Sequence, residues 1–472
     1  MTTILLIVII ISGFYMAWNI GANDVANAMG TSVGSGALSL KQAVIIAGLL
    51  EFCGAFFFGS HVSETIESGI VRADLFAGNY LILVYGMLAS LLSAGIWLQV
   101  ASYFGWPVST THSIVGSLIG FGTAVGGIHA VYWDNVAYIA TAWVISPLLG
   151  GLIAFFIFSL LLKKIFYVPN PLLATKRLTP WIIFMVMFTL SLSLVYQGLD
   201  NVSIQFSFTQ SILISLLVAG VGAVIGYFSV RRIHVQPHKE LPHTYDPSLV
   251  NKLQRALKHL EYVQARTSGD VGSQLSSLYD NTKDVSQTMQ KAVETHVSHT
   301  DFSSVERIFG KLQLITACLM AFSHGANDVA NAIGPLSAAV TTLLSGQIVA
   351  NAPVPLWTLG LGGIGIVVGL ATWGWRVIYT IGTKLTELTP TRGFAAEFGA
   401  AATILFASRL GFPISATHTL VGAVLGVGFA RGLAALNLAT MRDIVLSWIV
   451  TIPAGACLSI VIFYLILGIT GV

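Results

Sequence analysis

Apolar residues dominate long, separate stretches of this 472-residue sequence, and polar residues gather between them. A helix needs about 20 mostly apolar residues to cross the hydrocarbon core of a bilayer. The stretches at 109–126, 393–408 and 413–435 are short or rich in glycine, so we expect re-entrant or broken helices there. The pattern predicts an all-α polytopic membrane protein with about twelve spans: 3–29, 41–59, 79–101, 109–126, 136–162, 180–199, 209–229, 312–334, 356–380, 393–408, 413–435 and 444–470.

The composition indicates the same class. Apolar residues make up 55% of the chain, charged residues 9%, and the mean hydropathy is +0.81. A soluble domain has about 25% charged residues, so this chain lacks the polar surface that a water-soluble fold needs. These values exclude a globular cytosolic enzyme, a disordered chain and a secreted disulfide scaffold.

The charges that are present concentrate in one segment. Residues 231–311 hold 11 of the 23 Lys and Arg and 9 of the 20 Asp and Glu. Apolar residues recur there at helical spacing, which predicts about two amphipathic helices in water. We therefore expect two membrane halves, 1–230 and 312–472, joined by this hydrophilic insert. Packing and a regulatory role are both open for the insert.

Lys and Arg also predict the orientation, because they gather in the cytoplasmic loops of membrane proteins. Loops after odd-numbered spans carry most of them, whereas loops after even-numbered spans carry only Arg72 and Arg409. We expect a cell (plasma or inner) membrane protein with both termini outside and the insert in the cytoplasm. The net charge of +3 gives no reason to expect a nucleic-acid partner.

Two motifs occur twice, in the same order. The octapeptide Gly-Ala-Asn-Asp-Val-Ala-Asn-Ala stands at 21–28 and at 325–332, and a Pro-x-Ser-x-Thr-His turn stands at 107–112 and at 413–418. Offsets of 304 and 306 residues indicate an internal duplication. Each pair is separated by seven spans, an odd number, so the halves should be inverted in the membrane. Inverted repeats around a central site are typical of secondary transporters.

The octapeptides place acids in apolar spans, where each costs roughly 2.5–3.5 kcal/mol. Amides flank each acid, and carboxylate and amide oxygens suit a hard monovalent cation. Flanking glycines could let the helices break and expose carbonyls as further ligands. The alternative is hydrogen bonding that only holds helices together. The candidate cation ligands are Asn23, Asp24, Asn27, Asn327, Asp328 and Asn331.

Two more acids, Glu51 and Glu397, lie in apolar spans. An intramembrane carboxylate without compensation is expected to be functional, as a cation ligand or a proton carrier. The octapeptide offset does not relate these two acids, so they could have different roles.

The serine turns have the features of an anion site. Each proline suits the start of a helix, each serine suits its cap, and threonines follow in the first turn. A helix N-terminus binds phosphate or sulfate through its free N–H groups and its dipole, without a basic side chain. The candidate anion ligands are Ser109, Thr110, Thr111, Ser415 and Thr417.

With these motifs the chain resembles the inorganic phosphate transporter (PiT) family over nearly its whole length outside the insert. The resemblance rests on the two octapeptides, on the two serine turns and on the Glu51 span ending at Ile66. It implies symport of inorganic phosphate with a cation, a transport core of inverted repeats, a cytoplasmic middle loop and a homodimer. It also implies sodium at the two octapeptide acids, phosphate at the serine turns, and glutamates, Glu51 and Glu397, that are essential for transport.

One departure from the pattern is Ala416, which stands where the first turn has Thr110. Family members use sodium or proton coupling, and some relatives carry sulfate or metal–phosphate complexes. The octapeptide resembles the sodium-coupled branch. We therefore predict a sodium/phosphate symporter in contact with membrane lipid, with no cofactor other than the coupling ion. A proton-coupled phosphate or metal–phosphate symporter and a sulfate symporter are the alternatives.

Two other classes have less support. An enzyme is not expected, because no paired base and nucleophile and no metal-ligand cluster is evident in the sequence. A sensor that uses the hydrophilic insert is possible from the sequence.

Overall fold

The regular structure is helical wherever the computed structural model describes the chain, which is at residues 2–197, 206–231, 247–264, 267, 269–296, 299–349, 353–375, 377–378, 388–431 and 438–471. The first half contains α1 (Thr2–Gly34), α2 (Leu40–Phe58), α3 (Ser60–Ser68), η1 (Ala73–Phe76), α4 (Tyr80–Phe104), α5 (Thr110–Gly126), η2 (Ile128–Ala130), α6 (Trp133–Leu161), η3 (Leu162–Phe166), α7 (Pro171–Gln197) and α8 (Phe208–Arg231). The insert and second half contain α9 (Pro247–Gln264), α10 (Asp270–His296), α11 (His299–Asp328), α12 (Ala330–Ser345), α13 (Leu356–Thr372), α15 (Pro390–Arg409), α16 (Ala416–Arg431) and α17 (Leu438–Thr470).

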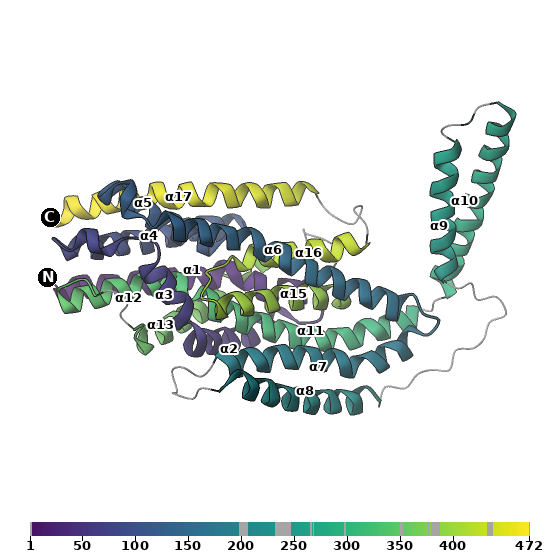
Figure 1. The fold of residues 1–472 in the computed structure, drawn as a ribbon, viewed down its shortest axis with the longest axis horizontal. Coiled ribbons are helices and arrows are strands. Elements are labelled where there is room, and N and C mark those ends of the chain that lie inside the picture. The colour runs from purple at the N-terminus through teal and green to yellow at the C-terminus, as the bar shows by residue number, and fades with distance from the viewer. Residues whose placement is uncertain are drawn as a thin grey trace. The chain divides into compact units, whose positions relative to one another are not determined.

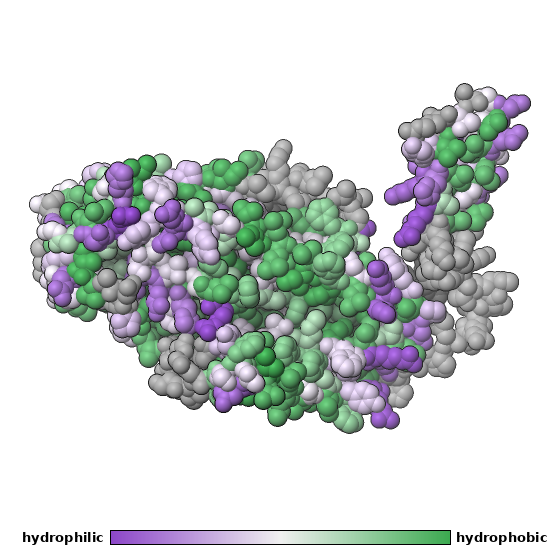
Figure 2. Space-filling model, in the orientation of Figure 1, coloured by the Kyte–Doolittle hydropathy of each residue, from purple (hydrophilic) through white to green (hydrophobic). Residues whose placement is uncertain are grey.

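The helices follow the hydrophobic pattern. The described part of each of the twelve predicted spans falls on a helix, with boundaries that differ, and the span at 312–334 falls on both α11 and α12. Residues 198–199, 376, 379–380 and 432–435 of the predicted spans lie outside the described residues. Seven described helices are long and apolar enough to cross a membrane alone. Figure 2 shows hydrophobic side chains over the middle of the helical bundle, as a lipid-facing surface requires. The all-α polytopic fold is confirmed.

Two compact units can be described separately. The first comprises residues 1–158, 185–219 and 310–472. The second comprises residues 159–184 and 220–309 and contains the predicted amphipathic helices, α9 and α10, which pack against each other (Figure 1). All of the candidate site residues belong to the first unit.

The two halves of the first unit are interlocked. Close contacts occur where glycines let a helix of one half approach a helix of the other: Gly116 of α5 faces the carbonyl of Ile452 in α17, and Gly422 of α16 faces the carbonyl of Pro147 in α6. A Cβ at Gly422 would lie 2.2 Å from that carbonyl oxygen. Equivalent glycines therefore make equivalent contacts, as the duplication predicts.

Corresponding helices run in opposite directions in Figure 1. Helix α1 starts at the N mark, whereas α11 and α12 run toward that end, and α17 ends there while α6 leads away from it. Both ends of the chain lie at the same end of the bundle. This arrangement is the one expected of inverted repeats.

One octapeptide helix is divided, at the single residue Val329, which keeps helical backbone angles (φ −56°, ψ −32°). Helix α1 continues through its octapeptide without a break, so the expected break at the flanking glycines is wrong for the first half. In the second half, α11 ends at Asp328 and α12 begins at Ala330. Pro335 lies within α12, six residues after Val329, and it lacks the N–H that would bond to the preceding turn.

Two glycines of α13 provide a test of this packing. A Cβ at Gly369 would lie 1.9 Å from the carbonyl oxygen of Trp18, whereas a Cβ at Gly360 would lie 3.7 Å from the Phe56 ring, an ordinary contact. We expect Gly369→Ala to lower the free energy of unfolding by roughly 1–3 kcal/mol, the usual cost of overpacking. Gly360→Ala should change it by less than about 0.5 kcal/mol. Thermal unfolding of the two purified variants in detergent measures the difference, and equal melting temperatures would contradict the close approach of α13 and α1.

Candidate functional site

The two octapeptide acids meet in the interior. One carboxylate oxygen of Asp24, one of Asp328 and a ring nitrogen of His324 all lie within 4.8 Å of one another. The three side chains are buried, with at most 1% of their surface exposed. The fold thus brings together two positions that are 304 residues apart, and we call Asp24, His324 and Asp328 the acid site.

The charge in the acid site is poorly compensated by the protein. Among the described residues, the ion-pair contacts of these acids are with His324 alone, whose Nε2 lies 2.9 Å from Asp328 Oδ2 and 3.8 Å from Asp24 Oδ2. Two carboxylates about 5 Å apart repel by about 3 kcal/mol at an effective dielectric constant of about 20. A cation between them would relieve that repulsion.

Glu51 lies behind the histidine. Its Oε1 is 3.2 Å from His324 Nδ1, on the opposite side of the ring from the nitrogen that faces the aspartates. Apart from this contact, the carboxylate oxygens of Glu51 have no hydrogen-bond partner among the residues that the structure describes. The nearest described partner of Glu51 is therefore His324, which the sequence motifs do not predict as a site residue. The only signal for it was the difference between His324 and the equivalent Ile20 just before the octapeptides.

The amides of the octapeptides make equivalent hydrogen bonds in both halves. Asn23 Nδ2 donates to Ser102 Oγ (3.0 Å), and Asn327 Nδ2 donates to Ser408 Oγ (2.9 Å). The amide oxygens of Asn23, Asn327 and Asn331 are buried and have no donor among the described residues. Oxygens of this kind can bind a cation without breaking an existing hydrogen bond.

The other amides connect the octapeptide of one half to the serine turn of the other. Asn27 Nδ2 donates to Thr417 Oγ1 (2.8 Å) and to Asp24 Oδ1 (2.9 Å). Asn331 Nδ2 contacts both Thr110 Oγ1 and Thr111 Oγ1 (3.2 Å each). Each half therefore supplies an amide to the candidate anion ligands of the other.

The two serine turns have the predicted helix caps. Ser109 Oγ accepts from the backbone N–H of His112, and Ser415 Oγ accepts from that of His418, both at 3.2 Å. Helices α5 and α16 begin here and contain 17 and 16 residues, or about 25 Å at 1.5 Å per residue, which is short of the roughly 30 Å of a bilayer core. They are the short helices that the sequence predicts.

The turns also contact each other. Thr111 Oγ1 donates to the carbonyl of Ile414 (2.9 Å), and Thr417 Oγ1 donates to that of Val108 (3.3 Å). Two helix N-termini thus meet next to the acid site, and their dipoles place partial positive charge there. Ala416 is buried at the position equivalent to Thr110, so Asn27 contacts one threonine whereas Asn331 contacts two.

Four rings pack directly behind the turns. His112 and His418 meet edge to face, with ring centroids 4.4 Å apart. His112 also contacts Trp143 of α6, and His418 stacks on Trp448 of α17. This cluster joins the two halves at the point where the turns meet.

Glu397 lies in a separate polar cluster. Its Oε1 accepts from Thr31 Oγ1, Ser32 Oγ and Gln313 Nε2, and its Oε2 accepts from Thr316 Oγ1, at 2.5–3.1 Å. All four donors come from α1 and α11, and the glutamate is fully buried. Glu397 therefore differs from Glu51, whose only polar contact in the described part of the chain is with His324.

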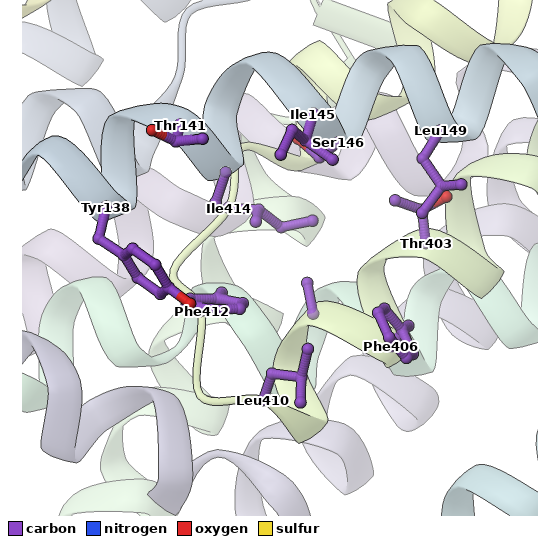
Figure 3. A pocket seen from close by; sticks show the side chains of 12 residues that line it. Tyr138, Thr141, Ile145, Ser146, Leu149, Thr403, Phe406, Leu410, Phe412 and Ile414 are labelled. Carbon is purple, nitrogen blue, oxygen red and sulfur yellow. The ribbon is translucent and has the colours of Figure 1, made fainter.

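A cavity of about 190 Å³ lies beside the second serine turn, between α6 and α15 (Figure 3). Phe412 and Ile414 line it on either side of Pro413, whose carbonyl accepts a hydrogen bond from Trp143 Nε1 (3.1 Å). Most of its lining is apolar, and none of the predicted ligands lines it. The cavity is unsuited to phosphate and is distinct from the candidate site.

Residues 20–459 match the phosphate transporter family. The chain belongs to this family. It is 46% identical over 456 residues to the inorganic phosphate transporter 2-1, chloroplastic, of Arabidopsis thaliana, covering 95% of this chain and 70% of the relative. It is 44% identical to a protein of Chlamydia trachomatis named as a phosphate permease, covering 98% of both chains. A solved structure described as the sodium-dependent phosphate transporter is 37% identical, covers 98% of each chain and superimposes with a TM-score of 0.79.

Membership in the phosphate transporter family confirms the resemblance noted in the sequence. The chain is a multi-pass membrane protein of a family of phosphate transporters, and its relatives are named as transporters and permeases rather than as enzymes. The assignment of individual ligands remains a prediction.

Helix α16 offers a matched test of the contact between the halves. Thr417 reaches Asn27 of the other half, whereas Thr419, also buried, donates only to the carbonyl of Ser415 in its own helix. We expect Thr417→Val to raise the phosphate concentration for half-maximal uptake by about tenfold, the factor that corresponds to about 1.4 kcal/mol. Thr419→Val should leave it within about twofold. Uptake of radiolabelled phosphate into proteoliposomes measures both, and equal effects would remove Thr417 from the site.

Proposed function

We propose that this protein is a sodium-coupled symporter of inorganic phosphate that works by alternating access. One observation carries the proposal: Asn27 donates to both Asp24 and Thr417, so a single side chain links the acid site to a serine turn. A cation held by the acids and an anion held by the turns would therefore be neighbours. Each would lower the electrostatic cost of binding the other.

The chemistry of the acid site favours a small cation. Carboxylate and amide oxygens are hard ligands, and within the described ranges the amide oxygens of Asn23, Asn327 and Asn331 have no donor. Phosphate adds further negative charge to a site that already contains two aspartates. Cations are needed before the anion can enter, which gives an order of binding in which sodium precedes or accompanies phosphate.

The anion is expected to lie between the two serine turns. The N-termini of α5 and α16 meet there, and backbone N–H groups with hydroxyls can bind phosphate without arginine or lysine. The proposed ligands are Ser109, Thr110, Thr111, Ser415 and Thr417. Release would follow when the sodium ions leave and the acids repel the anion.

Coupling requires that the states open to either side interconvert only when the site is empty or fully loaded. The contacts between the halves support this, because the site is shared by both and would be rearranged if one half moved against the other. The opposite directions of corresponding helices favour inverted repeats that exchange conformations.

The setting in the cell is also a proposal. The distribution of Lys and Arg favours a cytoplasmic insert and external termini in the cell membrane. Both ends of the chain lie at the same end of the bundle, as an even number of crossings requires. A homodimer is proposed from the family resemblance.

Glu397 makes proton coupling the second candidate. Its carboxylate is buried with four donors and no described basic partner, an environment in which a proton could be carried. Sulfate in place of phosphate is the other variant of the same fold, because helix N-termini bind both anions.

Uptake into proteoliposomes separates these functions. Radiolabelled phosphate uptake should be concentrative under an inward sodium gradient, and it should persist in the presence of excess unlabelled sulfate. If only an inward proton gradient drives uptake, the coupling ion is the proton and not sodium. Complete competition by sulfate would change the substrate instead.

Neutral substitutions of the acids test the cation site. We expect Asp24→Asn and Asp328→Asn each to raise the sodium concentration for half-maximal uptake by at least about tenfold, because each removes a charge worth more than about 1.4 kcal/mol to a bound cation. Asp134→Asn, at an exposed position at the start of α6, is the control and should not change it. Unchanged sodium dependence in both site variants would remove the cation assignment.

A further substitution tests Glu397. Glu397→Gln keeps the shape of the side chain and removes its charge, and we expect it to reduce sodium-driven uptake by at least about tenfold. Thermal unfolding of the variant is the control, since a lowered melting temperature would indicate a structural role. Normal uptake would show that transport does not need this carboxylate.

A further inference from the structure

Because the two halves are related by duplication, equivalent positions can be compared, and next to the acid site they hold different residues. Gly325 faces the carbonyl of Glu51, and its equivalent, Gly21, faces the carbonyl of Ile366. Glu51 and Ile366 are therefore equivalent positions. His324 and Ile20, which precede the two octapeptides, are equivalent as well.

A second glycine pair gives the same alignment. Gly54 faces the carbonyl of Phe322, and Gly369 faces that of Trp18, so α2 and α13 are related by an offset of 315 residues rather than 304. This longer offset explains why the sequence alone could not find the partner of Glu51.

One half thus has a glutamate and a histidine in contact where the other has two isoleucines. All four side chains are buried with no exposed surface. Both members of the pair are polar in one place and both are isoleucine in the equivalent place. This is the pattern expected if the glutamate and the histidine depend on each other. The isoleucine pair also demonstrates that the same helix crossing can be packed without polar groups.

We propose that Glu51 and His324 act as one unit that positions the aspartates of the acid site, and that Glu51 does not itself bind the cation. This inference rests on the proposed function, because it assigns the role of two residues at the same cation site. The imidazole faces Glu51 with Nδ1 and the aspartates with Nε2, so Glu51 acts through the ring.

Geometry explains why both residues would be needed. Glu51 holds the imidazole from its Nδ1 side, and the ring then presents Nε2 to Asp328 and Asp24. The pair would hold the two aspartates near each other without a bound ion. Removing either member alone leaves a buried charge without its partner, which is more damaging than removing both.

The isoleucine pair of the other half supplies the test. The variants are Glu51→Ile, His324→Ile and the double variant, with Ile20→Val/Ile366→Val as the control at the equivalent positions. Melting temperature in detergent reports folding. Proteoliposome uptake reports the half-saturating concentrations of sodium and, at saturating sodium, of phosphate.

Both single variants should have a lower melting temperature, and the double variant should recover most of that loss. The double variant should nevertheless need about tenfold more sodium for half-maximal uptake, which corresponds to about 1.4 kcal/mol. Its half-saturating phosphate concentration should stay within about twofold, because the pair does not contact the serine turns. The control variant should match the parent in both concentrations.

Three results would overturn the proposal: a double variant with the parent's sodium requirement, single effects that add independently in the double variant, or an unchanged Glu51→Ile variant. If the parent uses protons instead of sodium, the proposed function fails. The same variants, compared with the cation that does drive uptake, then still decide whether the pair is a unit. Glu51→Gln/His324→Gln replaces the double isoleucine variant if the latter does not fold.

Discussion

The fold depends on holding two aspartates close together in an apolar interior with a single histidine as their described ion-pair partner. Burying two carboxylates in an apolar interior costs free energy, and the polar groups around them lower that cost. A histidine contacts both acids, and the N-termini of two capped helices meet beside them, where Thr417 Oγ1 lies 3.4 Å from Asp24 Oδ1. Among the described residues, the two acids have His324 as their ion-pair partner, and the proposed cation site rests on this incomplete compensation.

Interlocking of the halves follows from the same requirement. Each octapeptide donates hydrogen bonds to the serine turn of the other half, and each turn donates to a carbonyl of the other turn. Glycines permit the close helix contacts that bring these groups within reach. A movement of one half relative to the other must therefore change these contacts, which under the proposed function would couple the binding of the two ions.

Much of this arrangement was predictable from the sequence, because the repeated motifs name Asp24, Asp328 and the two serine turns directly. The spans were predictable because apolar runs of this length are typical of helices that cross a bilayer. His324 was missed because it lies just outside the repeated octapeptide. The surroundings of Glu51 and Glu397 could not be predicted, since they depend on a local offset and on donors from distant helices. The unbroken α1 shows that glycines permit a break without requiring one.

Because each half contains only part of the site, a chain with one repeat could not assemble it alone. Asn27 would have no Thr417 to contact, and the two turns could not meet. Two copies of one half inserted in opposite orientations would bring two octapeptides and two serine turns together again, but both copies would be constrained to the same sequence. Joining them in one chain removes that constraint. Because the two halves of one chain can differ in sequence, equivalent positions now hold different residues: Ile20 and His324, Ile366 and Glu51, Ala416 and Thr110. The scaffold is symmetric, but the two sides of the site are chemically distinct.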